Sequence, residues 1–174
     1  MSHVFFDVNA ASDPNVFAQA TTQVSAEVTS NSPIVAERQE YFRYNGTIPG
    51  GTDVIGEPGP AKAAYSFAEG FTSTGFNEFL TLQNPNASSE SVAVTLYMQN
   101  SIISQQVVTV GPRTRVTLNI NGLVRSIDQA NSRAGYTVSL AVWASSGTIV
   151  AERPMYFNYR NIAQGGTDVV GYTG

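Results

Sequence analysis

Apolar and polar positions alternate with a period of two along much of the chain. The alternation is clear in 77–83 and 91–99, and Gly, Pro, Asn and Ser interrupt it at short intervals. Because successive side chains of a strand point to opposite faces of a sheet, this period predicts strands with one buried face. Further strands are predicted at 63–70, 103–110, 114–121, 136–144 and 148–159. About seven short strands at roughly ten-residue spacing predict an all-β antiparallel sandwich.

Two other parts of the chain have weaker patterns. The alternation stops at 122–131, where we expect a short helical turn or a loop. Toward the N-terminus, β-branched and aromatic residues predict strands at 4–9, 21–29 and 35–44. The glycines and the proline of 45–51 then predict a turn, followed by a short closing strand.

One stretch of the sequence occurs twice. Ile34 to Gly56 and Ile149 to Gly171 align over 23 residues without a gap at an offset of 115, and both contain IVAER, Tyr-Phe and GGTDV. The segment 57–62 carries two prolines, which end a sheet ladder because proline donates no hydrogen bond. The sequence therefore predicts the C-terminal half of a repeat in 1–56, a linker at 57–62 and a complete unit in 63–174. That is about one and a half repeats of a roughly 115-residue unit.

Composition narrows the classes of function. Charged residues make up 13% of the chain, about half the usual share, and the net charge is −4, so nucleic acid is a poor partner. The absence of cysteine excludes disulfides and thiolate metal sites, and the one histidine, His3, adjoins the N-terminus. No apolar run is long enough to span a membrane, and the N-terminus has no signal-peptide pattern. No cofactor is expected.

The complete unit resembles a repeat of large bacterial secreted and cell-surface proteins, found in tandem and without an assigned activity. The resemblance is carried by Ala68-Glu69-Gly70, Gly75 to Leu80, Leu82 to Pro85, Pro112 with Arg115, Ile149 to Tyr159, and Gly165-Gly166. It implies an immunoglobulin-like sandwich in a stalk, adhesive or filament-forming protein, located extracellularly or on the bacterial surface. The first copy departs from the pattern, because it lacks the half that contains the AEG motif (Ala68-Glu69-Gly70) and the NPN motif (Asn84-Pro85-Asn86).

Two arginines of the repeated stretch are expected to need acidic partners. Alternation places Arg153 on the apolar face of its strand, and a buried guanidinium requires a carboxylate. We expect Glu69 or Glu78 to form this structural ion pair. Arg38 is the unpaired counterpart, since 1–56 has no equivalent of Glu69. Residues 4–56 are therefore expected to be completed by a second chain, by a neighbouring filament subunit or by the adjacent domain of this chain.

Other candidate sites have simpler structural interpretations. Glu69 and Glu78 also suggest the carboxylate pair of a glycosidase, but so few charges and no nearby histidine give little support for catalysis. Asp53 and Asp168 are weak calcium candidates, because each glycine-rich loop offers a single carboxylate. Among the aromatic residues, Trp143 is expected between the sheets, whereas two tyrosines are candidate exposed contact residues, Tyr156 and Tyr172.

The sequence thus predicts a non-catalytic structural or adhesive module that acts by self-association and tandem display. The alternative is a carbohydrate-binding module of a secreted enzyme, which a cluster of exposed aromatics on one sheet face would favour. The expected partners are further copies of the chain or neighbouring repeats, or a glycan or other surface ligand.

Overall fold

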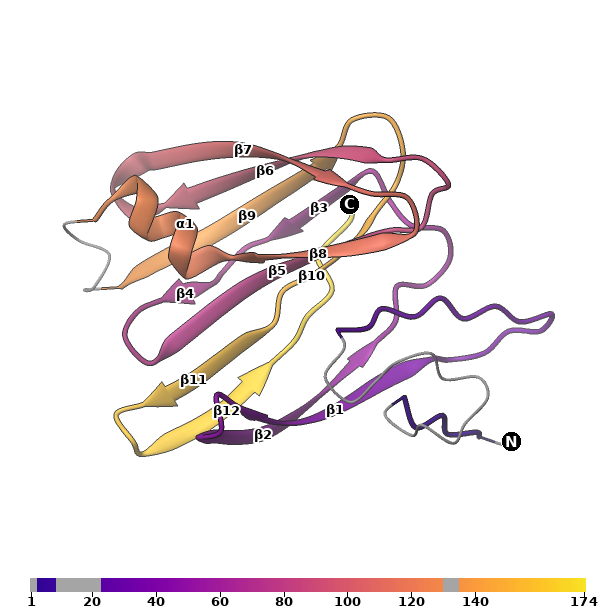
Figure 1. The fold of residues 1–174 in the computed structure, drawn as a ribbon, viewed down its shortest axis with the longest axis horizontal. Coiled ribbons are helices and arrows are strands. Elements are labelled where there is room, and N and C mark those ends of the chain that lie inside the picture. Colours follow the sequence, from indigo (N-terminus) through magenta and orange to yellow (C-terminus); the bar gives the residue numbers. More distant parts are fainter. Residues whose placement is uncertain (1–2, 9–22, 130–134) are drawn as a thin grey trace.

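A computed structural model of the chain describes residues 3–8, 23–129 and 135–174, and two antiparallel sheets dominate it (Figure 1). Four strands form the first sheet in the order β3 (Ala64–Phe67), β9 (Tyr136–Ala144), β6 (Glu90–Met98) and β7 (Ile102–Val110). The short strand β4 (Phe71–Thr72) also pairs with β9. The strands predicted at 63–70, 91–99, 103–110 and 136–144 therefore form, with shifts at their ends.

The second sheet is organised around β5 (Phe76–Asn84). On one edge β5 pairs with β8 (Thr114–Asn119), and on the other with β10 (Val150–Glu152) and β11 (Met155–Tyr159). The strand β12 (Ala163–Thr167) pairs with β11. The single strand predicted at 148–159 is thus divided at Arg153 and Pro154, because proline has no N–H to donate. The carbonyl of Pro154 still accepts a hydrogen bond from the Phe79 N–H at 2.9 Å.

Two short helices connect the strands. The 3-10 helix η1 (Gln99–Ser101) lies between β6 and β7, and α1 (Ile120–Ile127) follows β8. The side chain of Asn119 caps α1 by accepting the Gly122 N–H at 3.0 Å, and Ile120 and Val124 are buried. The break in alternation therefore marks a helix, which begins two residues before the predicted segment.

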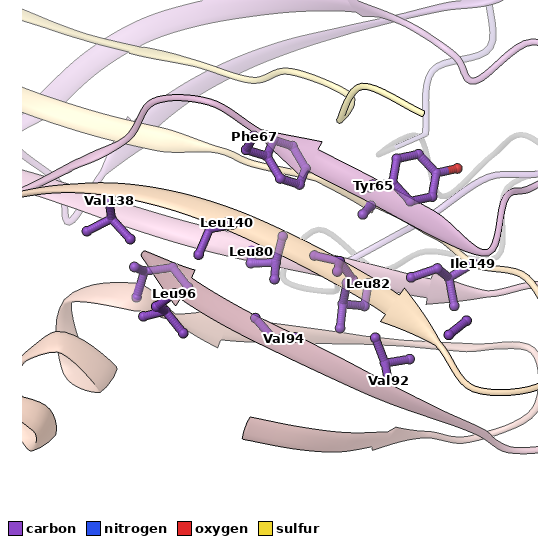
Figure 2. Close-up of a cluster of buried hydrophobic side chains, with 14 of the residues drawn as sticks. Tyr65, Phe67, Leu80, Leu82, Val92, Val94, Leu96, Val138, Leu140 and Ile149 are labelled. Carbon is purple, nitrogen blue, oxygen red and sulfur yellow. The ribbon is translucent and has the colours of Figure 1, made fainter. Parts of the chain in front are cut away.

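The core lies between the two sheets (Figure 2). Alternate residues of β6 and β9 point inward, and they meet apolar residues of the second sheet such as Leu80 and Leu82. All members of this core come from residues 65–151. The architecture is an all-β antiparallel sandwich, as the alternation predicted.

Trp143 corrects one expectation. It follows Val142 and precedes Ala144, which both point into the core, so its own side chain faces outward and is 60% exposed. The period of two decides this position, and the size and apolarity of the side chain do not.

The first copy of the repeated stretch forms a separate hairpin of β1 (Glu37–Tyr44) and β2 (Ile48–Ile55), which lies beside β12 (Figure 1). The strands predicted at 4–9 and 21–29 do not form in their described parts, 4–8 and 23–29. Residues 9–22 lie outside the description. A strand needs a paired neighbour for its backbone groups, and no described strand lies along either segment. None of the described helices is long and apolar enough to cross a membrane.

Candidate functional site

The two copies of the repeated stretch fold into hairpins with the same register. Tyr41 pairs with Gly51 in β1–β2, and Tyr156 pairs with Gly166 at the equivalent place in β11–β12. Both turns contain two consecutive residues with positive φ: Asn45 and Gly46, then Arg160 and Asn161. The correspondence continues past β12, where Glu152 bridges Val170 as Glu37 pairs with Ile55.

The hairpins pack through unlike faces. One face of β1–β2, which we call the arginine face, carries Arg38, Glu40, Phe42, Tyr44 and Thr52. It covers the outward face of β11–β12, which we call the acidic face and which carries Glu152, Tyr156, Gly166 and Asp168. Ile48 and Val54 also lie on the arginine face, and both are buried. We call the contact between the two faces the hairpin interface.

Arg38 forms the polar centre of the hairpin interface. Its Nη1 donates to Glu152 Oε2 at 3.0 Å, and its Nη2 donates to Asp168 Oδ2. The Asp168 N–H donates to Thr52 Oγ1 at 3.1 Å. Arg38 was expected to lack a partner in its half of the repeat, and the structure gives it two carboxylates from the complete unit of the same chain.

Burial sets the electrostatics of this ion pair. Burial raises the pKa of the Asp168 carboxyl to about 6, the charge of Glu152 adds to the rise, and the charge of Arg38 opposes it. Burial also acts to lower the pKa of Arg38, but the charges of Glu152 and Asp168 outweigh it and raise that pKa. The second cation nearby is Arg115, which donates to Gln23 Oε1 at 2.6 Å and to Thr81 Oγ1 at 3.1 Å.

Aromatic rings surround Tyr156 within the interface. Tyr44 stacks on Tyr156 with 4.3 Å between centroids, and Phe42 meets it edge to face at 4.9 Å. Phe79 of β5 contacts both tyrosines at 6.2 Å. Burial, followed by the charges of Glu40 and Asp168, raises the pKa of Tyr156 to about 12. Tyr156 is therefore a contact aromatic covered within its own chain, whereas Tyr172 is 75% exposed.

Glycines allow the hairpins to approach closely. A Cβ atom on Gly166 would lie 2.6 Å from Phe42 Cζ, and one on Gly50 would lie 3.3 Å from the Gly165 Cα. Side chains at these positions would separate the two hairpins. The repeated GGTD motif thus supplies both the close approach and, through Asp168, an acid for Arg38.

The calcium candidates have other surroundings. The Asp168 carboxylate forms an ion pair with the guanidinium of Arg38. Asp53 is exposed. Across the described residues, no three side chains of the His, Cys, Asp and Glu types converge in a way that would hold a metal ion.

Arg153 differs from its counterpart Arg38. It forms no ion pair shorter than 4.0 Å with any described residue, and its guanidinium lies 5.9 Å from the Phe67 ring centroid. Glu78 is fully buried, and burial raises its pKa to about 7 against the opposing charge of Arg153 and the Phe71 N–H. The predicted ion pair of Arg153 with Glu69 or Glu78 therefore does not form among the described residues, and Arg153 affects Glu78 only through its charge.

Glu69 lies on the surface, at an open pocket of about 250 Å³ that Arg153, Phe67 and Tyr172 also line. It does not meet Glu78 as a catalytic pair, because Glu78 is enclosed beneath the surface and Glu69 is exposed. The carboxylate of Glu78 instead packs on Gly70, where a Cβ atom would lie 2.0 Å from Glu78 Oε1. The glycine of the AEG motif thus leaves room for Glu78.

Other residues of the recognised motifs satisfy buried backbone groups. The Asn84 amide donates to the carbonyls of Val110 at 3.0 Å and Gly111 at 2.9 Å, and its Oδ1 accepts the Asn86 N–H. Glu90 accepts the Ser146 N–H at 2.8 Å, and this bond is the main cause of its lowered pKa. These contacts fix loops of the sandwich, so the NPN motif has a structural role here.

Comparison with known proteins supports the fold. No family model matches the chain, and no curated protein matches it. The crystal structure of Thermotoga maritima 1070 is similar over 67% of this chain and 97% of that one, with a TM-score of 0.55 and 13% identity. The Anabaena sensory rhodopsin transducer aligns over 56% of this chain and 99% of its own, with a TM-score of 0.45 and 15% identity. At these identities the likeness to the Thermotoga protein concerns the fold alone.

Proposed function

We propose that this chain is a non-catalytic structural module of a bacterial surface or extracellular protein, in which closing hairpins hold neighbouring units in a fixed arrangement. The observation that supports this proposal is the pairing of Arg38 with Glu152 and Asp168. All three residues belong to the repeated stretch, so a repeated element contacts its own second copy. A rigid connection between units suits tandem display, since it limits the motion of a linker such as 57–62.

Hydrogen exchange tests the proposal. The amides of β1 and β2 should be protected in the intact chain, and Arg38→Ala should reduce that protection up to about fivefold, because up to about 1 kcal/mol of partly exposed ion pairing is lost. Strands β5, β6 and β9 should keep their protection. Arg43→Ala is the matched control, since Arg43 lies on the exposed side of the same strand. Exchange in wild-type β1–β2 as fast as in 57–61 would rule out a fixed arrangement.

One observation favours carbohydrate binding as a second candidate function. The outer face of β3, β9, β6 and β7 exposes Trp143 by 60% and Tyr97 by 45%. The residues whose alternation places them on this face include no Asp, Glu, Lys or Arg. Aromatic rings with neighbouring hydroxyl and amide groups suit an uncharged glycan, which stacks on rings and exchanges hydrogen bonds.

Binding to neutral polysaccharides tests this candidate. Retention on insoluble cellulose, chitin and starch should fall at least tenfold in Trp143→Ala. Tyr41→Ala serves as the control, because Tyr41 is an exposed aromatic on a different element. Equal retention of both variants, or none by the wild type, would argue against a glycan site on this sheet.

A further inference from the structure

The outward face of β1–β2 repeats the charged, tyrosine and glycine positions of the acidic face of β11–β12, and it differs in carrying Arg43 where β11 has Asn158. Glu37, Tyr41, Gly51 and Asp53 occupy the positions of Glu152, Tyr156, Gly166 and Asp168 at the offset of 115. The register is also the same, since Tyr41 pairs with Gly51 and Glu37 with Ile55. Two equivalent surfaces therefore exist in the chain, and the structure shows what binds one of them.

The two surfaces differ in what covers them. On β11–β12, the arginine face of β1–β2 leaves Asp168 only 6% exposed. On β1–β2, Tyr41 is 84% exposed, and Glu37, Gly51 and Asp53 are exposed as well. The second acidic face thus presents two carboxylates, a tyrosine and a glycine, with Arg43 near the turn, and no described residue covers them.

We propose that this outward face of β1–β2 is a second docking site, and that its partner is the arginine face of β1–β2 from another copy of the chain. This inference deepens the proposed function and depends on it. Charge complementarity supports the choice of partner, because Glu37 and Asp53 stand where Glu152 and Asp168 receive Arg38. Gly51 leaves the same space above Tyr41 that Gly166 leaves for the Phe42 ring.

The contact is heterologous, because an arginine face meets an acidic face. Each copy that docks in this way brings a new acidic face with it, so the assembly grows as an open row rather than closing as a symmetric dimer. The equivalent arginine-type face of β11–β12 is not free for this contact, because it turns toward the inside of its own sandwich: Met155 pairs with the buried Glu78, and the Arg153 guanidinium lies 5.9 Å from the Phe67 ring centroid. Each chain therefore supplies one arginine face and two acidic faces.

Docking within the chain limits this assembly. The arginine face of β1–β2 is tethered beside its own β11–β12, so the high effective concentration favours the internal site. The second site also lacks a residue equivalent to Phe79, which contacts both tyrosines of the internal interface. The intact chain is therefore expected to be mainly monomeric, and release of β1–β2 is expected to permit association.

The test uses the full chain with its internal acidic face altered. Glu152→Lys with Asp168→Asn removes the internal partners of Arg38 and frees the arginine face. Sedimentation velocity should then show a weight-average mass that at least doubles over a hundredfold rise in concentration, whereas the wild type stays near the monomer mass. Asp168→Asn alone keeps the side-chain size and should give a smaller increase, which guards against misfolding of the double variant.

A second pair of changes identifies the surface. Adding Glu37→Lys and Asp53→Lys to the released variant should restore the monomer mass, because both carboxylates of the second site are lost. Glu27→Lys with Glu69→Lys is the control, with the same change in net charge at exposed positions elsewhere. A released variant that stays monomeric, or oligomers that Glu37 and Asp53 do not affect, would overturn the inference. Neither outcome changes the hydrogen-exchange comparison of Arg38→Ala with the wild type. That comparison therefore tests the proposed function separately from this inference.

Discussion

At the scale of a single residue, the protonation of Glu78 depends on whether the sandwich is folded. It lies on β5 with 0% exposure, and neither carboxylate oxygen has a hydrogen-bond partner of good geometry among the described residues. Burial raises its pKa from 4.5 to about 7, although Arg153 and the Phe71 N–H oppose the rise. The folded chain therefore holds this proton at pH values where the unfolded chain has released it.

The stability of the fold should consequently fall as the pH rises from 4.5 to about 7. In this window unfolding releases the proton, so a rise in pH favours the unfolded state, by up to about 3 kcal/mol from this group. Glu78→Gln should flatten the dependence and raise the free energy of unfolding at pH 7. Urea denaturation at several pH values measures this.

The pKa of Asp168 is also raised on folding, to about 6, so its titration lowers the stability over a nearby pH range. Wild type and Glu78→Gln should therefore be compared both with Asp168 intact and with Asp168→Asn. A pH dependence that is the same in wild type and Glu78→Gln would show that Glu78 does not carry it.

At the scale of elements, the repeated hairpin is used in two ways. In β11–β12 its arginine-type face turns toward its own sandwich, where Arg153 lies over Phe67, and in β1–β2 the equivalent face lies on another hairpin. The same sequence pattern thus supports two contacts, because a hairpin has two faces and each can be covered by a different element.

Two glycines at equivalent positions test the hairpin interface. A Cβ on Gly166 would meet the Met155 carbonyl at 3.0 Å and Tyr156 Cδ1 at 3.1 Å, and it would also lie 2.6 Å from Phe42. A Cβ on Gly51 would meet similar neighbours within its own hairpin, both at 3.2 Å, without the clash across the interface.

Gly166→Ala should therefore release β1–β2, with a loss of about 1–3 kcal/mol from overpacking, and Gly51→Ala should cost much less. Amide exchange in β1 and β2 separates the two outcomes. Equal loss of protection in both variants would mean that the effect arises inside each hairpin rather than between them.

At the scale of the whole molecule, the sandwich and the first hairpin are unequal in their contribution to stability. The buried core contains residues of 65–151, and none of the side chains described before Tyr65 belongs to it. The hairpin interface adds a smaller buried surface around Ile48, Val54 and Tyr156. The complete unit is therefore expected to fold without residues 1–61.

A chain that begins at Lys62 should keep its β-rich circular dichroism spectrum and melt at a lower temperature, because Tyr156 and Phe79 lose their cover. Thermal melting and light scattering of both chains measure this. Loss of the spectrum on truncation would show that β1–β2 is required for the sandwich to form.

The strands and the hairpins of this protein could largely be predicted from short stretches of its sequence. The period of two located the long strands of the complete unit, because it depends only on which side of a strand each residue faces. The duplicated stretch indicated two equivalent hairpins, and their registers match. The same period also places Trp143 outside, so the expectation of a buried tryptophan failed by giving side-chain size more weight than position.

The partners of these elements depend on distant parts of the chain. The sequence indicated that Arg38 and Arg153 need carboxylates, but it paired Arg153 with Glu69 or Glu78, and for the half that carries Arg38 it left open a second chain, a filament subunit or the adjacent domain of this chain. Only the packed structure places Arg38 against residues 114 and 130 positions away and Arg153 over Phe67. Alternation shows that a face must be covered, whereas the free energy of covering it depends on which surfaces the rest of the fold brings near, and that is decided in three dimensions.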